Sequence, residues 1–122
     1  MIRLWLFIAG VGGAASVIAG AAAAHLADDP AAATLLRNGS FYGMIHAAAL
    51  LAVIGFAQGR EPRRGLAVVT GWCFAAGILL FSLGQFVHAA TGFSRAALAV
   101  PVGGTAFIVG WAALAILAFR RR

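Results

Sequence analysis

The amino-acid sequence predicts an all-α integral membrane protein, a four-helix bundle that forms a single transmembrane domain over residues 1–122. Hydrophobic residues make up 63% of the chain and charged residues only 10%, against about 25% charged residues in soluble proteins. A soluble domain of this length has too little interior to bury so much apolar surface. The apolar residues also fall into four long runs, which short polar or arginine-containing segments separate.

The first apolar run covers residues 4–25. As a helix it would be about 33 Å long, enough to cross the hydrocarbon core of a bilayer. It is too long for the apolar part of a secretory signal peptide, which has about 7–15 residues. Gly12, Ser16 and Gly20 repeat at four-residue spacing, which lets a second helix approach closely. Trp5 is expected to anchor this helix at the membrane interface.

A polar connection follows over residues 26–37. Asp29 before Pro30 is typical of a helix N-terminus, because the aspartate caps the first turn and proline suits the first helical position. We therefore expect a short interfacial helix from Pro30 to the end of this connection. Asn38 and Gly39 are expected to end it.

The other apolar runs predict three further spans, at residues 40–58, 66–91 and 101–119. Gly92 closes the third span, and residues 93–100 are expected to form a short connection. Pro101 then suits the first turn of the fourth span. Further glycines are expected at helix-packing positions, because their small size permits close approach: Gly39, Gly43, Gly103, Gly104 and Gly110.

The arginines indicate how the chain threads the membrane. Four spans put both termini on one side, and seven arginines fall on that side: Arg3, Arg60, Arg63, Arg64, Arg120, Arg121 and Arg122. Only Arg37 and Arg95 fall on the other side. The positive-inside rule therefore predicts cytoplasmic termini in a bacterial inner membrane. The same rule explains the net charge of +6, so we do not expect a nucleic-acid partner.

This threading places the three histidines in the outer half of the membrane. His46 is predicted about 9 Å below the outer end of the second span. Ser82 and Gln85, at matching depth on the third span, are expected to hydrogen-bond to a neutral His46 imidazole, because a charged one is costly in hydrocarbon. The candidate polar or ligand layer consists of His46, Ser82, Gln85, His25 and His88.

Two interpretations of this polar layer remain open. In the first, the polar groups satisfy one another and hold the helices together. In the second, the layer binds a metal, haem or small ligand, or relays protons. Acid–base catalysis is not expected, because the acidic residues Asp28, Asp29 and Glu61 all lie in loops. The lone Cys73 excludes an intrachain disulfide.

Four short motifs occur in order along the chain: GAAAAH at residues 20–25, FYGMIHA at 41–47, GILLFS at 77–82 followed by Thr91-Gly92, and PVGGTAFIVGW at 101–111. In this order and spacing the chain resembles the YgdD/YwdK family of small four-helix membrane proteins, a domain of unknown function with a eukaryotic branch. His25, His46 and Ser82 match the family pattern, whereas Gln85 and His88 do not. The resemblance implies the fold and the membrane location and supplies no activity.

The primary interpretation of function is therefore a helix-packing or accessory subunit of a membrane assembly. Its expected partners are the lipid bilayer and other membrane helices, in a homo-oligomer or a larger complex. The alternatives are a membrane module that binds a small ligand, metal or haem, and a pathway for protons or a small solute.

Overall fold

The computed structural model describes residues 1–59 and 63–119 of the chain. Within these ranges the chain forms four long helices, each long and apolar enough to cross a membrane. They are α1 (Ile2–His25), α2 (Pro30–Ala57), a third span made of α3 (Arg63–Gly77), η1 (Ile78–Ser82) and α4 (Leu83–Thr91), and α5 (Ser94–Leu117). The predicted all-α bundle of four spanning helices is confirmed.

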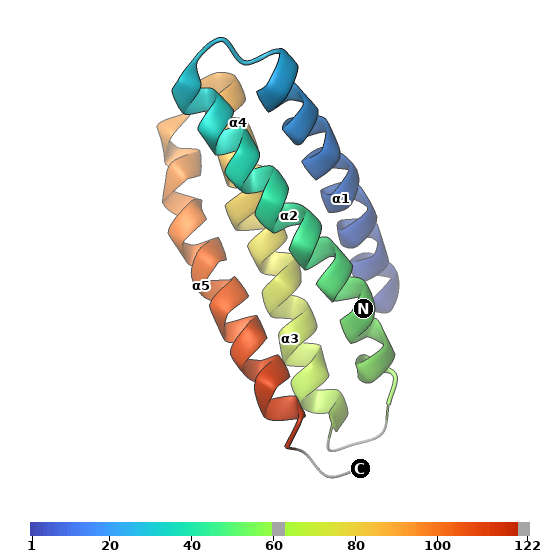
Figure 1. Ribbon diagram of the computed structural model, residues 1–122. Helices are drawn as coiled ribbons and strands as arrows, with labels where there is room; N and C mark the ends of the chain where they lie inside the picture. Colours follow the sequence, from blue (N-terminus) through green and yellow to red (C-terminus); the bar gives the residue numbers. More distant parts are fainter. Residues whose placement is uncertain (60–62, 120–122) are drawn as a thin grey trace.

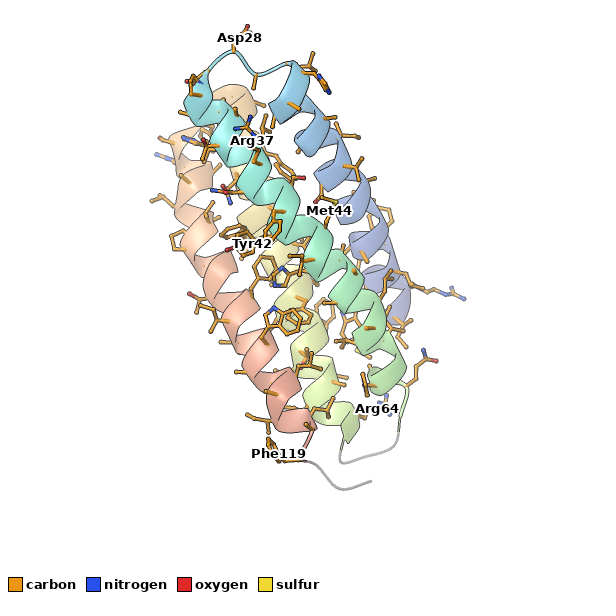
Figure 2. The ribbon with its side chains drawn as sticks, viewed as in Figure 1. Asp28, Arg37, Tyr42, Met44, Arg64 and Phe119 are labelled. Carbon is orange, nitrogen blue, oxygen red and sulfur yellow. The ribbon has the colours of Figure 1, made fainter. Side chains whose placement is uncertain are left out.

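The helices run antiparallel, with α2 and the third span in the middle of the bundle (Figure 1). α1 packs mainly against α2, and α5 packs mainly against the third span, so these two helices form opposite flanks. Both described ends of the chain lie at one end of the bundle. The turn that contains Asp28 lies at the other end, far from Arg64 (Figure 2).

The interfacial helix that the sequence predicts is not separate, because α2 continues through Asn38 and Gly39 without a break. Asp29 caps the helix as predicted, accepting hydrogen bonds from the backbone N–H groups of Ala31 and Ala32. Glycine costs about 1 kcal/mol in a helix. Tertiary packing offsets that cost here, since Gly39 is buried where a Cβ would collide with the Phe86 ring.

The connection predicted at residues 93–100 is also helical, because α5 already begins at Ser94. Gly92 adopts a left-handed conformation (φ 67°) that closes α4, and its N–H donates to the His88 carbonyl. Pro101 therefore lies inside α5 rather than at its start. Pro101 has no N–H for the helical hydrogen bond to the Ala97 carbonyl, and a proline inside a membrane helix is tolerated because the rest of the helix and its packing hold it.

Small residues bring α1 close to its neighbours. A Cβ on Gly20 would lie 2.9 Å from the Ser40 hydroxyl, and a Cβ on Gly12 would lie 2.7 Å from the Ile78 side chain. The Ser40 hydroxyl donates to the carbonyl of Ser16 at 2.6 Å, which joins α2 to α1. The four-residue repeat on α1 therefore faces the inside of the bundle.

Trp5 does not anchor the interface as the sequence predicts. It is completely buried, and its ring covers Gly71 on α3, where a Cβ would overlap it. The Trp5 and Trp72 rings meet edge to face at 5.8 Å. Because Gly71 has no side chain, there is room for the Trp5 indole in the interior of the bundle. The indole therefore packs inside the protein instead of lying at the membrane interface.

Candidate functional site

The candidate site is centred on His46, a histidine on α2 that is only 3% exposed. It lies sixteen residues after the first residue of α2, Pro30, so it is about 24 Å along the helix. The predicted depth of about 9 Å assumed that the span begins near Gly39. Because the helix does not break there, His46 lies near the middle of the bundle rather than in an outer layer.

Both ring nitrogens of His46 are hydrogen-bonded. Nδ1 lies 2.7 Å from the backbone carbonyl of Tyr42 on the same helix. Trp111 on α5 donates its indole N–H to Nε2 at 2.8 Å. A carbonyl can only accept and an indole N–H can only donate, so this arrangement fits one neutral tautomer with the proton on Nδ1. The partners differ from the predicted Ser82 and Gln85.

Aromatic rings enclose the His46 imidazole on several sides. Phe107 on α5 stacks on it with ring centroids 3.5 Å apart and planes 13° apart. Phe74 on α3 meets it edge to face at 5.4 Å. Tyr42, which Figure 2 labels, stacks more distantly at 6.3 Å. The imidazole thus has an apolar surrounding and a single interhelical polar contact.

Glycines make room for these rings. A Cβ on Gly77 would overlap the Phe107 ring, and a Cβ on Gly110 would lie 2.6 Å from the Phe74 ring. Gly103 packs directly against the backbone of Phe81 in η1, and a Cβ on Gly104 would lie 3.5 Å from the Phe81 ring. Larger residues at these positions would push α5 away from the third span, and with it Trp111 away from His46.

A groove of about 300 Å³ opens beside this site between α2 and α5. It is lined by Tyr42, His46, Phe81, Gly104, Phe107, Ile108 and Trp111. Trp111, which is 44% exposed, lines this groove together with His46. A metal would need the Nε2 lone pair, which the Trp111 N–H occupies.

Ser82 is buried elsewhere, between α1 and α2. It ends the π-helical segment η1, where the N–H of Leu83 donates to the carbonyl of Ile78, five residues back. Ser82 is 1% exposed, and its hydroxyl has no hydrogen-bond partner within the described part of the chain. It lies beside Gly43, where a Cβ would be 3.0 Å from it and would overlap the Ser16 hydroxyl.

The remaining members of the predicted polar layer lie in two other places. Gln85, which is 4% exposed, lines a groove on the α5 side of α4 together with His88. His25 is exposed at the end of α1. In the described ranges, no group of three histidine, cysteine, aspartate or glutamate side chains could hold a metal ion. The five residues therefore do not form one layer.

Sequence reasoning missed Trp111, Phe107 and Phe74 as neighbours of His46. One signal was present, because Trp111 ends the fourth motif and His46 belongs to the second, and these two motifs meet at their hydrogen bond. The third motif contributes Gly77, which accommodates Phe107 of the fourth. The motifs thus converge on one packing site rather than on a cluster of polar groups.

Comparisons with known proteins agree with this architecture. A family model described as "Protein of unknown function (DUF423)" matches residues 19–104, a range that includes His46 and Ser82 and ends before Phe107. The chain is 32% identical over 84 residues to the "UPF0382 membrane protein YwdK" of Bacillus subtilis (strain 168). That match covers 69% of this chain and 68% of the relative. No solved structure matches the chain.

Proposed function

The chain belongs to the DUF423 family and has a membrane protein as a relative, and from this premise we propose that it is a helix-packing subunit of a larger assembly in the bacterial cytoplasmic membrane. In this role the protein presents the outer face of α1 to a membrane helix of its partner. The His46–Trp111 contact fixes the shape of the bundle, so that this face is presented rigidly.

The observation that carries the proposal is the position of Gly10 on α1. Most described glycines of the spans have a neighbour against their Cβ position, as Gly12 and Gly20 do. Nothing lies within 4 Å of the Cβ position of Gly10 on α1, or of that of Gly55 near the end of α2. A glycine in a helix costs about 1 kcal/mol relative to alanine, and in membranes small residues are favoured where another helix approaches closely.

The residues around Gly10 suit a docked helix. α1 packs mainly against α2, which leaves its opposite face uncovered. On that face Gly10 and Ala14 are exposed one turn apart. Phe7, which is 66% exposed, and Ile18, which is 69% exposed, stand on either side of them. Because both residues of this pair are small, a large apolar side chain of a partner helix could approach the α1 backbone closely here.

The orientation of the bundle belongs to the same proposal. The arginine distribution supports cytoplasmic termini, because the four-span order of the sequence assigns seven of the nine arginines to the side of the termini. In this orientation the Asp28 turn faces the outside.

Photo-cross-linking in native membranes tests this function. Phe7 is replaced by p-benzoylphenylalanine, which keeps an aromatic ring beside Gly10 and Ala14. We expect a specific adduct, identified by mass spectrometry as a second copy or as another membrane protein. Adding Gly10→Leu should abolish the adduct by preventing this close approach.

The control places p-benzoylphenylalanine at Ile108 on the opposite flank, where the side chain is 71% exposed. Adducts from this position should not respond to Gly10→Leu. The proposal fails if Phe7 and Ile108 give the same lipid adducts alone, or if the Phe7 adduct survives Gly10→Leu in a protein whose melting temperature is unchanged.

A further inference from the structure

A second groove lies between α1 and the third span, apart from the site around His46. Six of the residues that line it form its two walls: Phe7, Val11 and Ala15 on α1, and Leu79, Leu83 and Phe86 on the third span. Gly12 and Ile78 meet at its floor, since a Cβ on Gly12 would lie 2.7 Å from the Ile78 side chain. The enclosed part of the groove has a volume of about 80 Å³.

The walls of this groove favour a hydrocarbon chain as its occupant. Of the described residues that line it, Ser82 alone is polar, and its hydroxyl is buried against Gly43, where a Cβ would lie 3.0 Å from it. Apolar cavities stay dry, and one of about 150 Å³ takes up benzene. The enclosed 80 Å³ is therefore too small for a ring and suits a few methylene groups of a chain.

The α1 wall of the groove continues to a positive charge. Phe7, Val11 and Ala15 follow one another at four-residue spacing, which places them on one side of the helix. Arg3, the second residue of α1, is four residues before Phe7 and is exposed, so it extends the same row. From Arg3 to Ala15 the row is about 18 Å long, close to the roughly 15 Å of hydrocarbon in one leaflet.

We propose that this groove binds one acyl chain of an anionic phospholipid, whose phosphate pairs with Arg3. The chain runs from the start of α1 past Phe7 and Val11 to Ala15, near the middle of the bilayer. Long arginine side chains extend to the membrane interface, where a guanidinium group forms charge-assisted hydrogen bonds with a phosphate. An arginine beside the membrane also attracts anionic lipids over neutral ones.

The wall opposite α1 has an unusual backbone. Leu79 belongs to the π-helical segment η1, and Leu83 directly follows it. The N–H of Leu83 donates to the carbonyl of Ile78, five residues back. Such π-helical turns are rare and occur frequently at functional sites. Their presence along this groove supports a binding site rather than a packing fault.

Native mass spectrometry of the protein tests the proposal, with phosphatidylglycerol and, separately, phosphatidylcholine of identical acyl chains. We expect the parent protein to retain phosphatidylglycerol preferentially. Ala15→Leu fills the groove, so the retention of both lipids should be lost. Arg3→Gln should lower the retention of phosphatidylglycerol about fivefold and remove the preference for it.

Two matched controls make the same substitutions away from the groove. Ala112→Leu changes an exposed alanine on α5, the opposite flank, and Arg64→Gln changes an exposed arginine at the start of α3. Neither change should alter the retention of either lipid. If Ala15→Leu does not fold, Val11→Trp narrows the groove at its rim, where Val11 is 53% exposed, and carries the same expectation.

The proposal is overturned if a folded groove-filling variant retains phosphatidylglycerol as the parent does, or if Ala112→Leu loses it equally. An undiminished preference for phosphatidylglycerol in Arg3→Gln would also overturn it. A free fatty acid that displaces the phospholipid at equal concentration would assign the groove to fatty acids instead. Gly10 does not line the groove, so Gly10→Leu should leave lipid retention unchanged, and the two proposals fail separately.

Discussion

Trp111 on α5 donates its indole N–H to Nε2 of His46 on α2 at 2.8 Å, across 65 residues of sequence. The bond lies in an apolar surrounding that Phe107 and Phe74 provide. Each partner satisfies a polar atom that would otherwise be buried among hydrocarbon groups. The pair therefore ties the two helices together while leaving no polar group of His46 without a partner.

Replacing Trp111 by phenylalanine should destabilise the bundle. The change keeps an aromatic ring but leaves Nε2 of His46 without its donor. Interhelical hydrogen bonds in membranes average about 0.6 kcal/mol, and an unsatisfied buried group costs about 1–3 kcal/mol. We expect a loss within this range in the free energy of unfolding, measured by denaturant titration in mixed micelles.

Trp72→Phe is the matched control for this prediction. Trp72 has the same exposed fraction as Trp111, 44%, and should respond less. In a double-mutant cycle, His46→Leu combined with Trp111→Phe should cost less than the two single changes added together. Strict additivity would mean that the hydrogen bond contributes nothing to stability.

The replacement of His46 itself separates a structural role from a chemical one. His46→Gln should be tolerated better than His46→Leu, because the amide can still accept from Trp111 and donate to the Tyr42 carbonyl. Thermal melting of the two variants in the same detergent gives the comparison. If His46 holds a metal or moves protons, both variants should lose the bound species or the flux equally while remaining folded.

Gly43 and Gly55, both on α2, provide a matched pair for packing. A Cβ on Gly43 would overlap the Ser16 hydroxyl, whereas nothing lies within 4 Å of the Cβ position of Gly55. Gly43→Ala should cost about 1–3 kcal/mol through overpacking, and Gly55→Ala should be neutral or slightly stabilising. Equal unfolding free energies for the two variants would contradict the close contact at Gly43.

Two of the three buried serines in the described ranges, Ser40 and Ser82, should respond differently to alanine. Ser40 donates to the Ser16 carbonyl at 2.6 Å, so Ser40→Ala should lower the free energy of unfolding by about 0.5–1.5 kcal/mol. The Ser82 hydroxyl has no partner among the described residues, so Ser82→Ala should be neutral or stabilising. A larger loss in Ser82→Ala than in Ser40→Ala would show that the Ser82 hydroxyl has a stabilising partner in the membrane.

Reporter fusions test the orientation that the arginines indicate. A cytoplasm-active reporter fused after Arg122 should be active, and one inserted at the Asp28 turn should be inactive, because Asp28 and Phe119, the last described residue, lie at opposite ends of the bundle (Figure 2). A periplasm-active reporter should give the reverse pattern. Activity of the periplasmic reporter after Arg122 would invert the proposed topology.

The sequence by itself determined the membrane class, the four spans and the cap at Asp29. These features are local. An uncharged run of membrane length is enough to predict a spanning helix, and a capping side chain acts on the first turn of its own helix. The helix ends were predicted less well. Asn38-Gly39 and Pro101 are local helix breakers, yet α2 and α5 continue through them because packing and the membrane outweigh propensity.

Only the tertiary structure decided which side chain satisfies His46. Depth along the helices favoured Ser82 and Gln85, but the choice depends on how each helix is rotated about its axis. Gly77 and Gly110 set that rotation by admitting the rings of Phe107 and Phe74, which brings Trp111 to Nε2 and leaves Ser82 against α1. Since such contacts join residues far apart in the chain, no local pattern specifies them.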